Sequence, residues 1–148
     1  MDIGEIEDAE IETVVDLWSR CDLTRPWNDP RADIALARSG ATSSVLVARQ
    51  EGALVATAMV GSDGHRGWVY YLAVEPAQQG RGLGRAMMAA VEQWAKDRGV
   101  TKIQLMVRAG NARATGFYKA LDYRTEDTIV MGKRFDGQSW ATAPDPAP

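Results

Sequence analysis

The spacing of apolar residues predicts a short strand and two helices in the first 40 positions. A strand is expected over residues 2–7, and Asp8 then offers an oxygen that can cap a helix. The helix after it carries apolar residues at helical spacing, namely Ile11, Val14, Val15 and Trp18. Prolines break this pattern in "DLTRPWNDP", and a second, shorter helix is predicted over residues 31–40.

Three apolar runs in the middle of the chain predict an antiparallel meander. "SSVLVAR" and "LVATAMVG" are two strands joined by a turn at "QEG", and a second turn at residues 62–67 leads to "WVYYLAV". The third run is apolar on both faces, so we expect its strand to be central and buried.

The second half of the chain alternates helices and strands. A helix predicted over residues 84–98 is followed by the strand "KIQLMV" and by a helix in "NARATGFYKALDY", with Asn111 as its cap. "TEDTIVMGKRF" is expected to form a last strand or pair of strands. The order β-α-α-β-β-β-α-β-α-β predicts the α/β class with a mixed sheet, in which helix 84–98 crosses over between two parallel strands.

Composition limits the kind of protein. The 148 residues suit a single domain over residues 1–136, and we expect the Pro/Ala-rich tail 137–148 to be disordered. A net charge of −3 does not favour nucleic-acid binding. The N-terminus has no signal-peptide pattern, and no apolar run reaches the roughly 18 residues needed to cross a membrane. The single cysteine, Cys21, fits a cytoplasmic location, and we expect it to be a small apolar residue rather than a nucleophile.

The stretch "PAQQGRGLGRAMM" places three glycines between a strand and a helix. The first amides of a helix have no intrahelical partner and the helix dipole is positive there, so this junction is typical of an anion site. Arg81 and Arg85 add positive charge. The alternative is a tight turn with close helix packing. The loop lacks the Gly-Lys-Ser/Thr end of a Walker loop and the Gly-x-Gly-x-x-Gly of a dinucleotide site.

The pattern Gln79-x-x-Gly82-x-Gly84 resembles the pyrophosphate-binding motif of the GNAT superfamily of acetyl-CoA-dependent N-acetyltransferases. "NARATGFYKALDY" is similar to a second motif of that family, although Asp122 replaces its usual glycine. "RPWNDP" and "DGHRG" are similar to a YpeA-like bacterial branch. The resemblance implies the GNAT fold: a mixed, mostly antiparallel sheet with a central splayed pair of parallel strands and helices on both faces. It also implies acetyl-CoA as co-substrate. No metal is implied, because no residues have the spacing of metal ligands.

By this resemblance, an amine attacks the thioester directly, without an acyl-enzyme. Main-chain groups of one strand would contact the pantetheine arm and the oxyanion, from Leu72, Ala73 and Val74. Main-chain amides of the loop would hold the pyrophosphate, from Gln79, Gly80, Arg81, Gly82, Leu83, Gly84 and Arg85. Asn111 would touch the cofactor near its sulfur, or only cap its helix. Tyr118 would be the general acid for the leaving thiolate, or only a half-buried member of an apolar stripe.

The sequence leaves the general base open. Glu75 and His65 are candidates, Asp63 and Tyr70 are further ones, and a water chain would serve equally well. GNAT enzymes that acetylate the N-terminal alanine of a ribosomal protein have a glutamate base where this chain has Met106. That difference weakens the hypothesis of a peptide N-terminus as acceptor.

The connection between the first two helices usually borders the acceptor site in this fold. Here Arg25, Trp27 and Asn28 would bind a polar amine or a carboxylate, or the connection is only a turn with Trp27 in the core. The turn residues Asp63, His65 and Arg66 are expected to join this pocket.

The function predicted is N-acetyl transfer from acetyl-CoA to a primary amine of a small molecule or amino acid. The alternatives are a peptide N-terminus or lysine as acceptor, and a non-catalytic acetyl-CoA-binding sensor. Dimers are common in the family, so a homodimer is expected, with no nucleic-acid or membrane partner.

Overall fold

The computed structural model describes residues 1–138, so most of the tail predicted over 137–148 lies outside the described residues. The elements follow one another as β1 (Asp2–Glu5), the 3-10 helix η1 (Asp8–Glu10), α1 (Ile11–Arg20), α2 (Pro30–Arg38), β2 (Ser43–Gln50), β3 (Ala53–Ser62), β4 (Gly67–Val74), the 3-10 helix η2 (Pro76–Gln78), α3 (Leu83–Asp97), β5 (Ile103–Leu105) and α4 (Ala112–Ala120).

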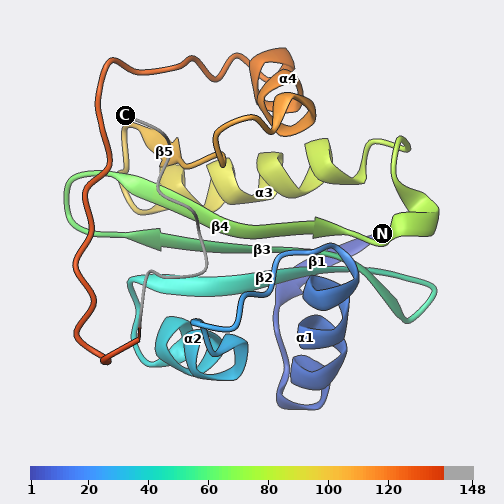
Figure 1. Cartoon of the computed structure of the whole chain (residues 1–148). Coiled ribbons are helices and arrows are strands. Elements are labelled where there is room, and N and C mark those ends of the chain that lie inside the picture. The colour runs from blue at the N-terminus through green and yellow to red at the C-terminus, as the bar shows by residue number, and fades with distance from the viewer. Residues whose placement is uncertain (139–148) are drawn as a thin grey trace.

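The strands form one sheet in the order β1-β2-β3-β4-β5 (Figure 1). Neighbouring strands from β1 to β4 are antiparallel, whereas β4 and β5 are parallel. The structure therefore confirms both the predicted meander and the role of α3 as a crossover between parallel strands. The mixed sheet with helices on both faces is also confirmed.

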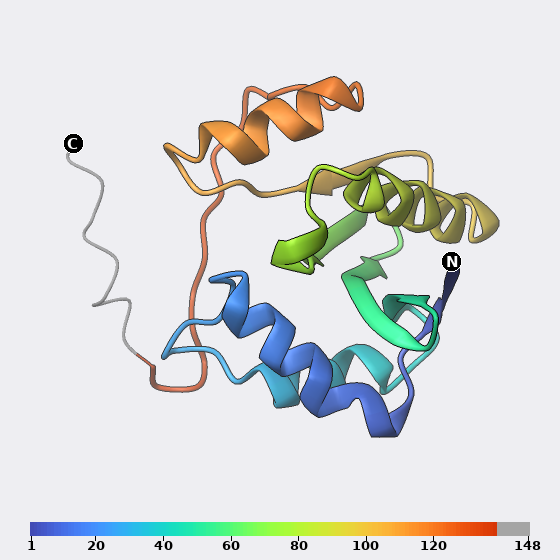
Figure 2. The same ribbon diagram turned by 90° about the vertical axis from the view of Figure 1, so that its right-hand side faces the viewer.

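The apolar stripes of the helices cover the two faces of the sheet (Figures 1 and 2). α1 and α2 lie on one face, where Trp18 and Ile34 are fully buried. α3 lies on the other face and buries Met87 and Val91, and Phe117 of α4 packs on the same side. Within residues 1–138, no helix combines the length and the apolar character that a membrane span requires.

Two helix starts show how local capping decides boundaries. Asp8 does not cap α1, because it begins the 3-10 helix η1, whose N-cap is Glu7, and the N-cap position of α1 is held by Glu10. The Glu7 amide donates to the Glu10 carboxylate at 2.8 Å. α2 begins one residue earlier than predicted, at Pro30. The Asp29 carboxylate accepts two amides of its first turn, and proline is well suited to the first helical position.

The strand "WVYYLAV" differs from its prediction as a central, buried strand. It becomes β4, which is next to the sheet edge, and Tyr70 in its middle is 43% exposed. The cause is the short pairing with β5, which stops after Val69 and Leu105. The second half of β4 therefore borders an opening instead of another strand.

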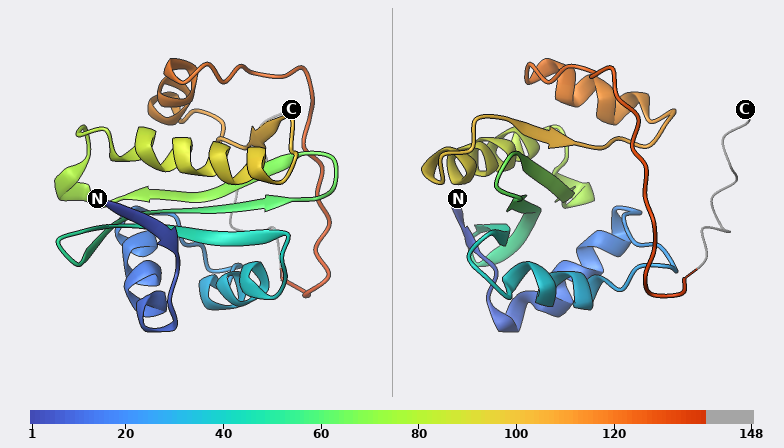
Figure 3. Two further views of the ribbon diagram at one scale, coloured as in Figure 1. Left: turned by 180° about the vertical axis from the view of Figure 1, so that it is seen from behind. Right: turned by 90° about the vertical axis from the view of Figure 1, so that its left-hand side faces the viewer.

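The last predicted strand, over residues 125–135, is absent. Between residues 1 and 138, no backbone hydrogen bond joins residues 124–135 to any other segment. This segment runs in extended form along the outside of the molecule, from α4 towards α2 (Figure 3). Its β-forming residues have no strand partner within the described chain, and strand propensity alone does not create a ladder.

Candidate active site

The opening between β4 and β5 contains a β-bulge in β4. The register between β3 and β4 shifts between Thr57 and Met59, where two residues of β4, Tyr71 and Leu72, oppose one residue of β3. Tyr71 has a φ of 52°, in the left-handed region that non-glycine residues seldom adopt. The bulge and the missing partner strand leave main-chain groups between Leu72 and Val74 facing the opening.

A set of buried contacts holds Tyr71 in this conformation. Its ring stacks on Trp18 with the ring centroids 3.8 Å apart. The Trp18 indole N–H donates to the Thr57 hydroxyl at 2.8 Å, and that hydroxyl donates to the Tyr71 carbonyl at 3.1 Å. On the other side, the Tyr71 hydroxyl donates to Asp33 at 2.7 Å. The strained backbone is therefore fixed by its surroundings, as such residues at functional sites are.

Thr57→Val is expected to lower the free energy of unfolding by about 1–3 kcal/mol, because the Trp18 indole N–H would be left buried without an acceptor. Thermal unfolding should show a Tm several degrees below that of the parent protein. Thr13→Val, at an exposed position of α1, is the matched control and should leave the Tm unchanged. Equal Tm values for the two variants would contradict the structural role of the Thr57 hydroxyl.

The glycine loop leads from the end of β4 to the N-terminus of α3. Gly80 and Gly82 have φ values of 80° and 83°, and an added Cβ at either position would meet nothing within 4 Å. Gly82 caps α3 without any side-chain hydrogen bond, so the first amides of the helix are left for a ligand. Gly84 differs, since a Cβ there would lie 3.1 Å from the Phe117 ring. The loop thus contains main-chain amides that are free to bind an anion, and one glycine that is needed for packing against Phe117.

Two residues of the predicted cofactor site have structural contacts of their own. The Gln79 side chain donates to the Val74 carbonyl at 3.2 Å and accepts from Arg113 at 2.9 Å, which ties the loop to β4 and α4. Asn111 caps α4 by accepting the Ala114 amide at 3.1 Å. The capping interpretation of Asn111 is therefore confirmed, and any contact of Asn111 with a cofactor stays a prediction.

Tyr118 lies on α4 and lines a cavity of about 1080 Å³ between α4, β5 and the segment after α4. Its ring is half-buried and packs edge-on against Phe117 and Tyr123, at centroid distances of 5.0 and 5.9 Å. Burial raises the pKa of the Tyr118 hydroxyl to about 12. The hydroxyl is therefore protonated near neutral pH, and because it makes no hydrogen bond within the described residues it is available as a donor.

The candidate bases are not gathered at the opening. Both oxygens of Glu75 accept from Arg20, at 2.6 and 2.7 Å. His65 lies in the β3–β4 hairpin, at the opposite end of the sheet from the glycine loop, and Asp63 caps the same turn by accepting the amides of His65 and Arg66 (Figure 1). Glu75, Asp63 and His65 do not line the smaller cavity described next, and neither does Arg66, so the turn residues expected to join the acceptor pocket lie outside it. The fourth candidate base, Tyr70, does line that cavity.

A second cavity, of about 470 Å³, lies between α2, β3 and β4. Its polar lining comes from four parts of the chain: the connection between α1 and α2 (Arg25 and Asn28), α2 (Asp33), β4 (Tyr70 and Tyr71) and the loop after β5 (Arg108). Two of the three predicted acceptor residues are thus brought together, while Trp27 is half-buried outside the lining and its carbonyl accepts from Arg134.

Sequence reasoning missed three residues of this cavity. Asp33 and Tyr71 lie 38 positions apart, and their contact depends on the bulge, which has no signature in the sequence. Arg108 follows a strand that ends earlier than predicted. Tyr70 is predicted from the sequence only as a possible base, not as part of the acceptor pocket. Burial, with a smaller contribution from the charge of Asp63, raises the pKa of its hydroxyl.

Neither Cys21 nor any group of metal-binding side chains adds a reactive centre to the described residues. The Cys21 thiol is half-buried and donates to the Val74 carbonyl at 3.3 Å, and burial raises its pKa, so it stays a thiol near neutral pH. Among residues 1–138, no three His, Cys, Asp or Glu side chains are grouped so that they could hold a metal ion.

A splayed mixed sheet with a glycine loop at the head of its crossover helix defines an acetyltransferase class. Comparison with known proteins agrees. The profile of the Acetyltransferase (GNAT) family matches residues 11–123, and the chain belongs to this family. An acetyltransferase from Yersinia enterocolitica is 44% identical over 134 residues, which cover 90% of this chain and 95% of that protein. An acetyltransferase from Pectobacterium atrosepticum is equally similar.

Solved structures confirm the fold. The aminoglycoside acetyltransferase AAC(6')-Iy, solved with a bisubstrate analogue of CoA and acetylneamine, superposes with a TM-score of 0.76 at 17% identity, over 90% of this chain and 97% of that chain. An aminoglycoside 6'-N-acetyltransferase from Acinetobacter haemolyticus gives a TM-score of 0.73 at 18% identity, over 92% of this chain and 100% of that chain. At these identities the likeness establishes the GNAT fold alone.

Proposed function

We propose that this acetyltransferase moves an acetyl group from acetyl-CoA directly to a primary amine of a small molecule. One observation carries the proposal. The free amides of the glycine loop and the unpaired main chain beyond the bulge lie together at the same end of β4. The fold neighbour AAC(6')-Iy, which has also been solved with CoA, supports the choice of cofactor.

The glycine loop supplies the anion-binding part of this reaction. The amides from Gly80 to Arg85 would hold the pyrophosphate, and left-handed glycines let the backbone approach it without a Cβ in the way. Arg81 and Arg85 are exposed and make no ion pair within residues 1–138, so both guanidinium groups are available to an anion.

The bulge and Tyr118 supply the chemical step. The amine nitrogen attacks the thioester carbon, and a main-chain N–H between Leu72 and Val74 would stabilise the oxyanion. The C–S bond then breaks, and Tyr118 is the donor that protonates the departing sulfur. The proton lost by the amine passes to water, because Glu75 is engaged by Arg20 and His65 lies in the distant hairpin.

The smaller cavity supports a small-molecule acceptor. Its volume of about 470 Å³ lies within the range of roughly 300–1,000 Å³ that is usual for small-ligand sites. Arg25, Asp33 and Arg108 offer charges of both signs there, which suits an amine that carries other polar groups. The solved fold neighbours named above act on aminoglycosides, which are small-molecule amines.

The test is release of free CoA from acetyl-CoA, measured with a thiol reagent, over free amino acids, polyamines, aminoglycosides and a peptide with a free N-terminus. Turnover with at least one small amine, together with a mass increase of one acetyl group on that amine, is the expected result. Turnover with the peptide alone would favour the protein acceptor. Tight binding of acetyl-CoA without turnover of any amine would favour the sensor.

The pH dependence of kcat/KM follows from the raised pKa of Tyr118. Burial keeps the hydroxyl protonated up to about pH 12, so its proton-donating form is not lost between pH 7 and 10. We expect kcat/KM to rise over this range as the acceptor amine loses its proton, and then to reach a plateau. A fall that begins near pH 10, the ordinary pKa of tyrosine, would contradict the assignment.

A further inference from the structure

The smaller cavity carries more positive than negative charge. Its charged lining consists of two guanidinium groups, from Arg25 and Arg108, and one carboxylate, from Asp33. The chain as a whole has a net charge of −3, so this positive surplus belongs to the cavity and not to the protein in general. A ligand that carries several ammonium groups and no anion is repelled at such a site, whereas an anionic group is attracted.

Arg25 has a guanidinium group that is held in place but only partly used. Its side chain is 22% exposed, and Nη1 donates to the main-chain carbonyls of Asp22 and Thr24, both at 2.8 Å. The Asp22 carboxylate lies 3.5 Å from the same nitrogen and is exposed, so it contributes little. Within residues 1–138, Nε and Nη2 donate to no protein group. These two nitrogens form an edge that can bind a carboxylate through two parallel hydrogen bonds.

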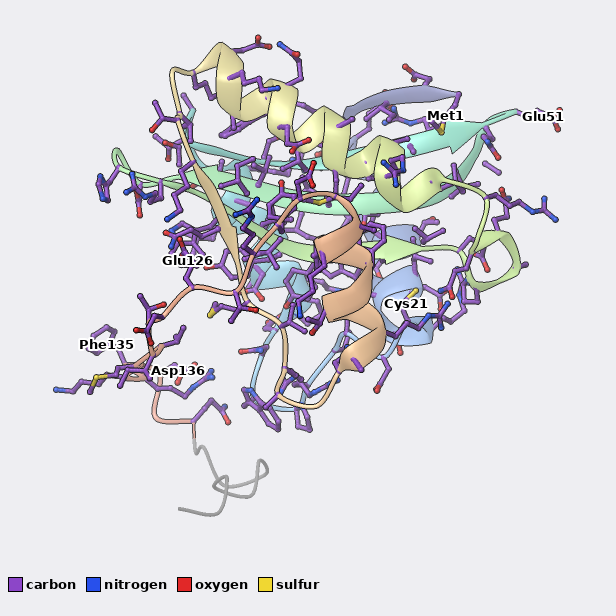
Figure 4. The ribbon with its side chains drawn as sticks, turned by 90° about the horizontal axis from the view of Figure 1, so that it is seen from above. Met1, Cys21, Glu51, Glu126, Phe135 and Asp136 are labelled. Atoms are coloured by element: carbon purple, nitrogen blue, oxygen red, sulfur yellow. The ribbon has the colours of Figure 1, made fainter. Side chains whose placement is uncertain are left out.

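Two other arginines near the cavity are less suited to hold an anion in a fixed position. Arg108 is exposed on the loop after β5, so ordering its long side chain costs conformational entropy. The Arg134 guanidinium donates to Asp136 at 2.6 and 3.0 Å and to the Trp27 carbonyl at 2.5 Å. Figure 4 shows Asp136 at the outer rim of the molecule. Arg25 is therefore the guanidinium group whose free edge is also positioned.

Asp33 offers the complementary group on another wall of the cavity. Its Oδ2 accepts from the Tyr71 hydroxyl at 2.7 Å, and among residues 1–138 its Oδ1 accepts no hydrogen bond. Tyr71 belongs to the bulge that precedes the free main chain of residues 72–74. The Asp33 carboxylate is therefore positioned relative to the place where the proposed function puts the thioester. It can accept an N–H of an amine that approaches this place.

The remaining lining and the charge balance define the rest of the ligand. Most of the other lining side chains are apolar, namely Leu23, Leu36, Ala37, Met59 and Val60. They suit the hydrocarbon part of a small amine. A surplus of one positive charge suits a carboxylate better than a phosphate group, which carries about −1.5 to −2 charges at pH 7.

We propose that the acceptor is an amino acid, whose free carboxylate binds the Nε–Nη2 edge of Arg25 while its amine donates to Asp33. The inference rests on the proposed function and narrows it from small amines in general to amines that carry a carboxylate. It also separates this chain from the aminoglycoside acetyltransferases that share its fold, because an aminoglycoside offers several ammonium groups but no carboxylate.

The first experiment compares each common amino acid with its own carboxamide as acceptor, by steady-state release of CoA from acetyl-CoA. The carboxamide has the less basic amine, so more of it is neutral and reactive, and this difference works against the proposal. We expect kcat/KM to be at least about 10-fold higher for the amino acid in the best pair, as the loss of a charged hydrogen bond implies.

The outcomes of this comparison separate the inference from the proposed function. If carboxamides, aminoglycosides or the matching aminophosphonates had an equal or higher kcat/KM, the inference would be overturned and the proposed function would stand. If no small amine were acetylated, both would be overturned.

Arg25→Gln tests the residue that the proposal assigns to the carboxylate. We expect the KM for the amino acid to rise by about 10- to 100-fold and the KM for its carboxamide to stay within about twofold, so that the preference disappears. Arg25→Lys keeps the charge but loses the two-nitrogen edge, and should retain only part of the preference. Arg31→Gln is the matched control on α2, because Arg31 pairs with Glu12 and does not line the cavity. It should keep the KM values of the parent.

Asp33→Asn should have a different signature. Asparagine keeps an oxygen that can accept from Tyr71 but loses the charge that holds the amine. The KM values for the amino acid and for the carboxamide should therefore rise together, and the preference for the carboxylate should remain. If Arg25→Gln raised both KM values alike, Arg25 would only stabilise its loop, and the assignment of the carboxylate to Arg25 would be wrong.

Discussion

Replacing Tyr118 by phenylalanine is expected to lower kcat by about 100-fold, the lower end of what a positioned proton donor contributes. The ring contacts with Phe117 and Tyr123 remain in the variant, and the hydroxyl makes no hydrogen bond within the described residues. The affinity for acetyl-CoA and the Tm should therefore stay close to those of the parent. Steady-state kinetics on the best acceptor, together with a direct binding measurement of acetyl-CoA, separates these effects.

Tyr123→Phe is the matched control for this prediction. Its ring also packs against Tyr118, and its pKa is also raised, but its hydroxyl already donates to Glu92 at 3.2 Å. Loss of that bond should cost on the order of 1 kcal/mol of stability and leave kcat within about twofold. If both variants retained the kcat of the parent, Tyr118 would be one more half-buried tyrosine, and the sulfur would take its proton from water.

The parts of the site that depend on local backbone chemistry could be predicted from the sequence. The left-handed glycines at Gly80 and Gly82 and the cap at Asn111 follow from short-range rules of helix ends. Asp122 adopts a φ of 67° where the family usually has glycine, as the tolerance of aspartate for this conformation allows. In each case, neighbouring residues determine the geometry.

The parts that depend on distant contacts could not be predicted. The contact of Asp33 with Tyr71 requires α2, β3 and the bulge to be in place at once, and no single stretch of sequence contains that information. The strand expected over residues 125–135 failed for a related reason. Its propensity was identified correctly, but a strand also needs a ladder partner, and residues 125–135 make no backbone hydrogen bond to the free outer edge of β5 or to any other described segment.

Gly82→Val is expected to weaken acetyl-CoA binding by about 5- to 30-fold, which corresponds to the roughly 1–2 kcal/mol that a left-handed conformation costs a residue with a side chain. The free loop can relax to a negative φ, and binding must then restore the strained form. Because an added Cβ at this exposed position meets nothing within 4 Å, the fold itself should persist. Calorimetric titration with acetyl-CoA and with CoA measures the loss directly.

Gly64→Val is the matched control, and it tests whether the weaker acetyl-CoA binding of Gly82→Val comes from the cofactor site or from backbone strain anywhere in the protein. Gly64 has a φ of 90°, and an added Cβ there also meets nothing within 4 Å, but it lies in the β3–β4 hairpin at the far end of the sheet. The same conformational penalty should therefore lower stability without changing the Kd for acetyl-CoA. Equal affinities in the two variants would mean that the conformation of Gly82 does not matter for cofactor binding, and the pyrophosphate would have to be held elsewhere. If only Gly82→Val weakened acetyl-CoA binding, the pyrophosphate would lie at the N-terminus of α3. Both variants place valine in a left-handed conformation, so this strain by itself cannot explain a difference in affinity between them.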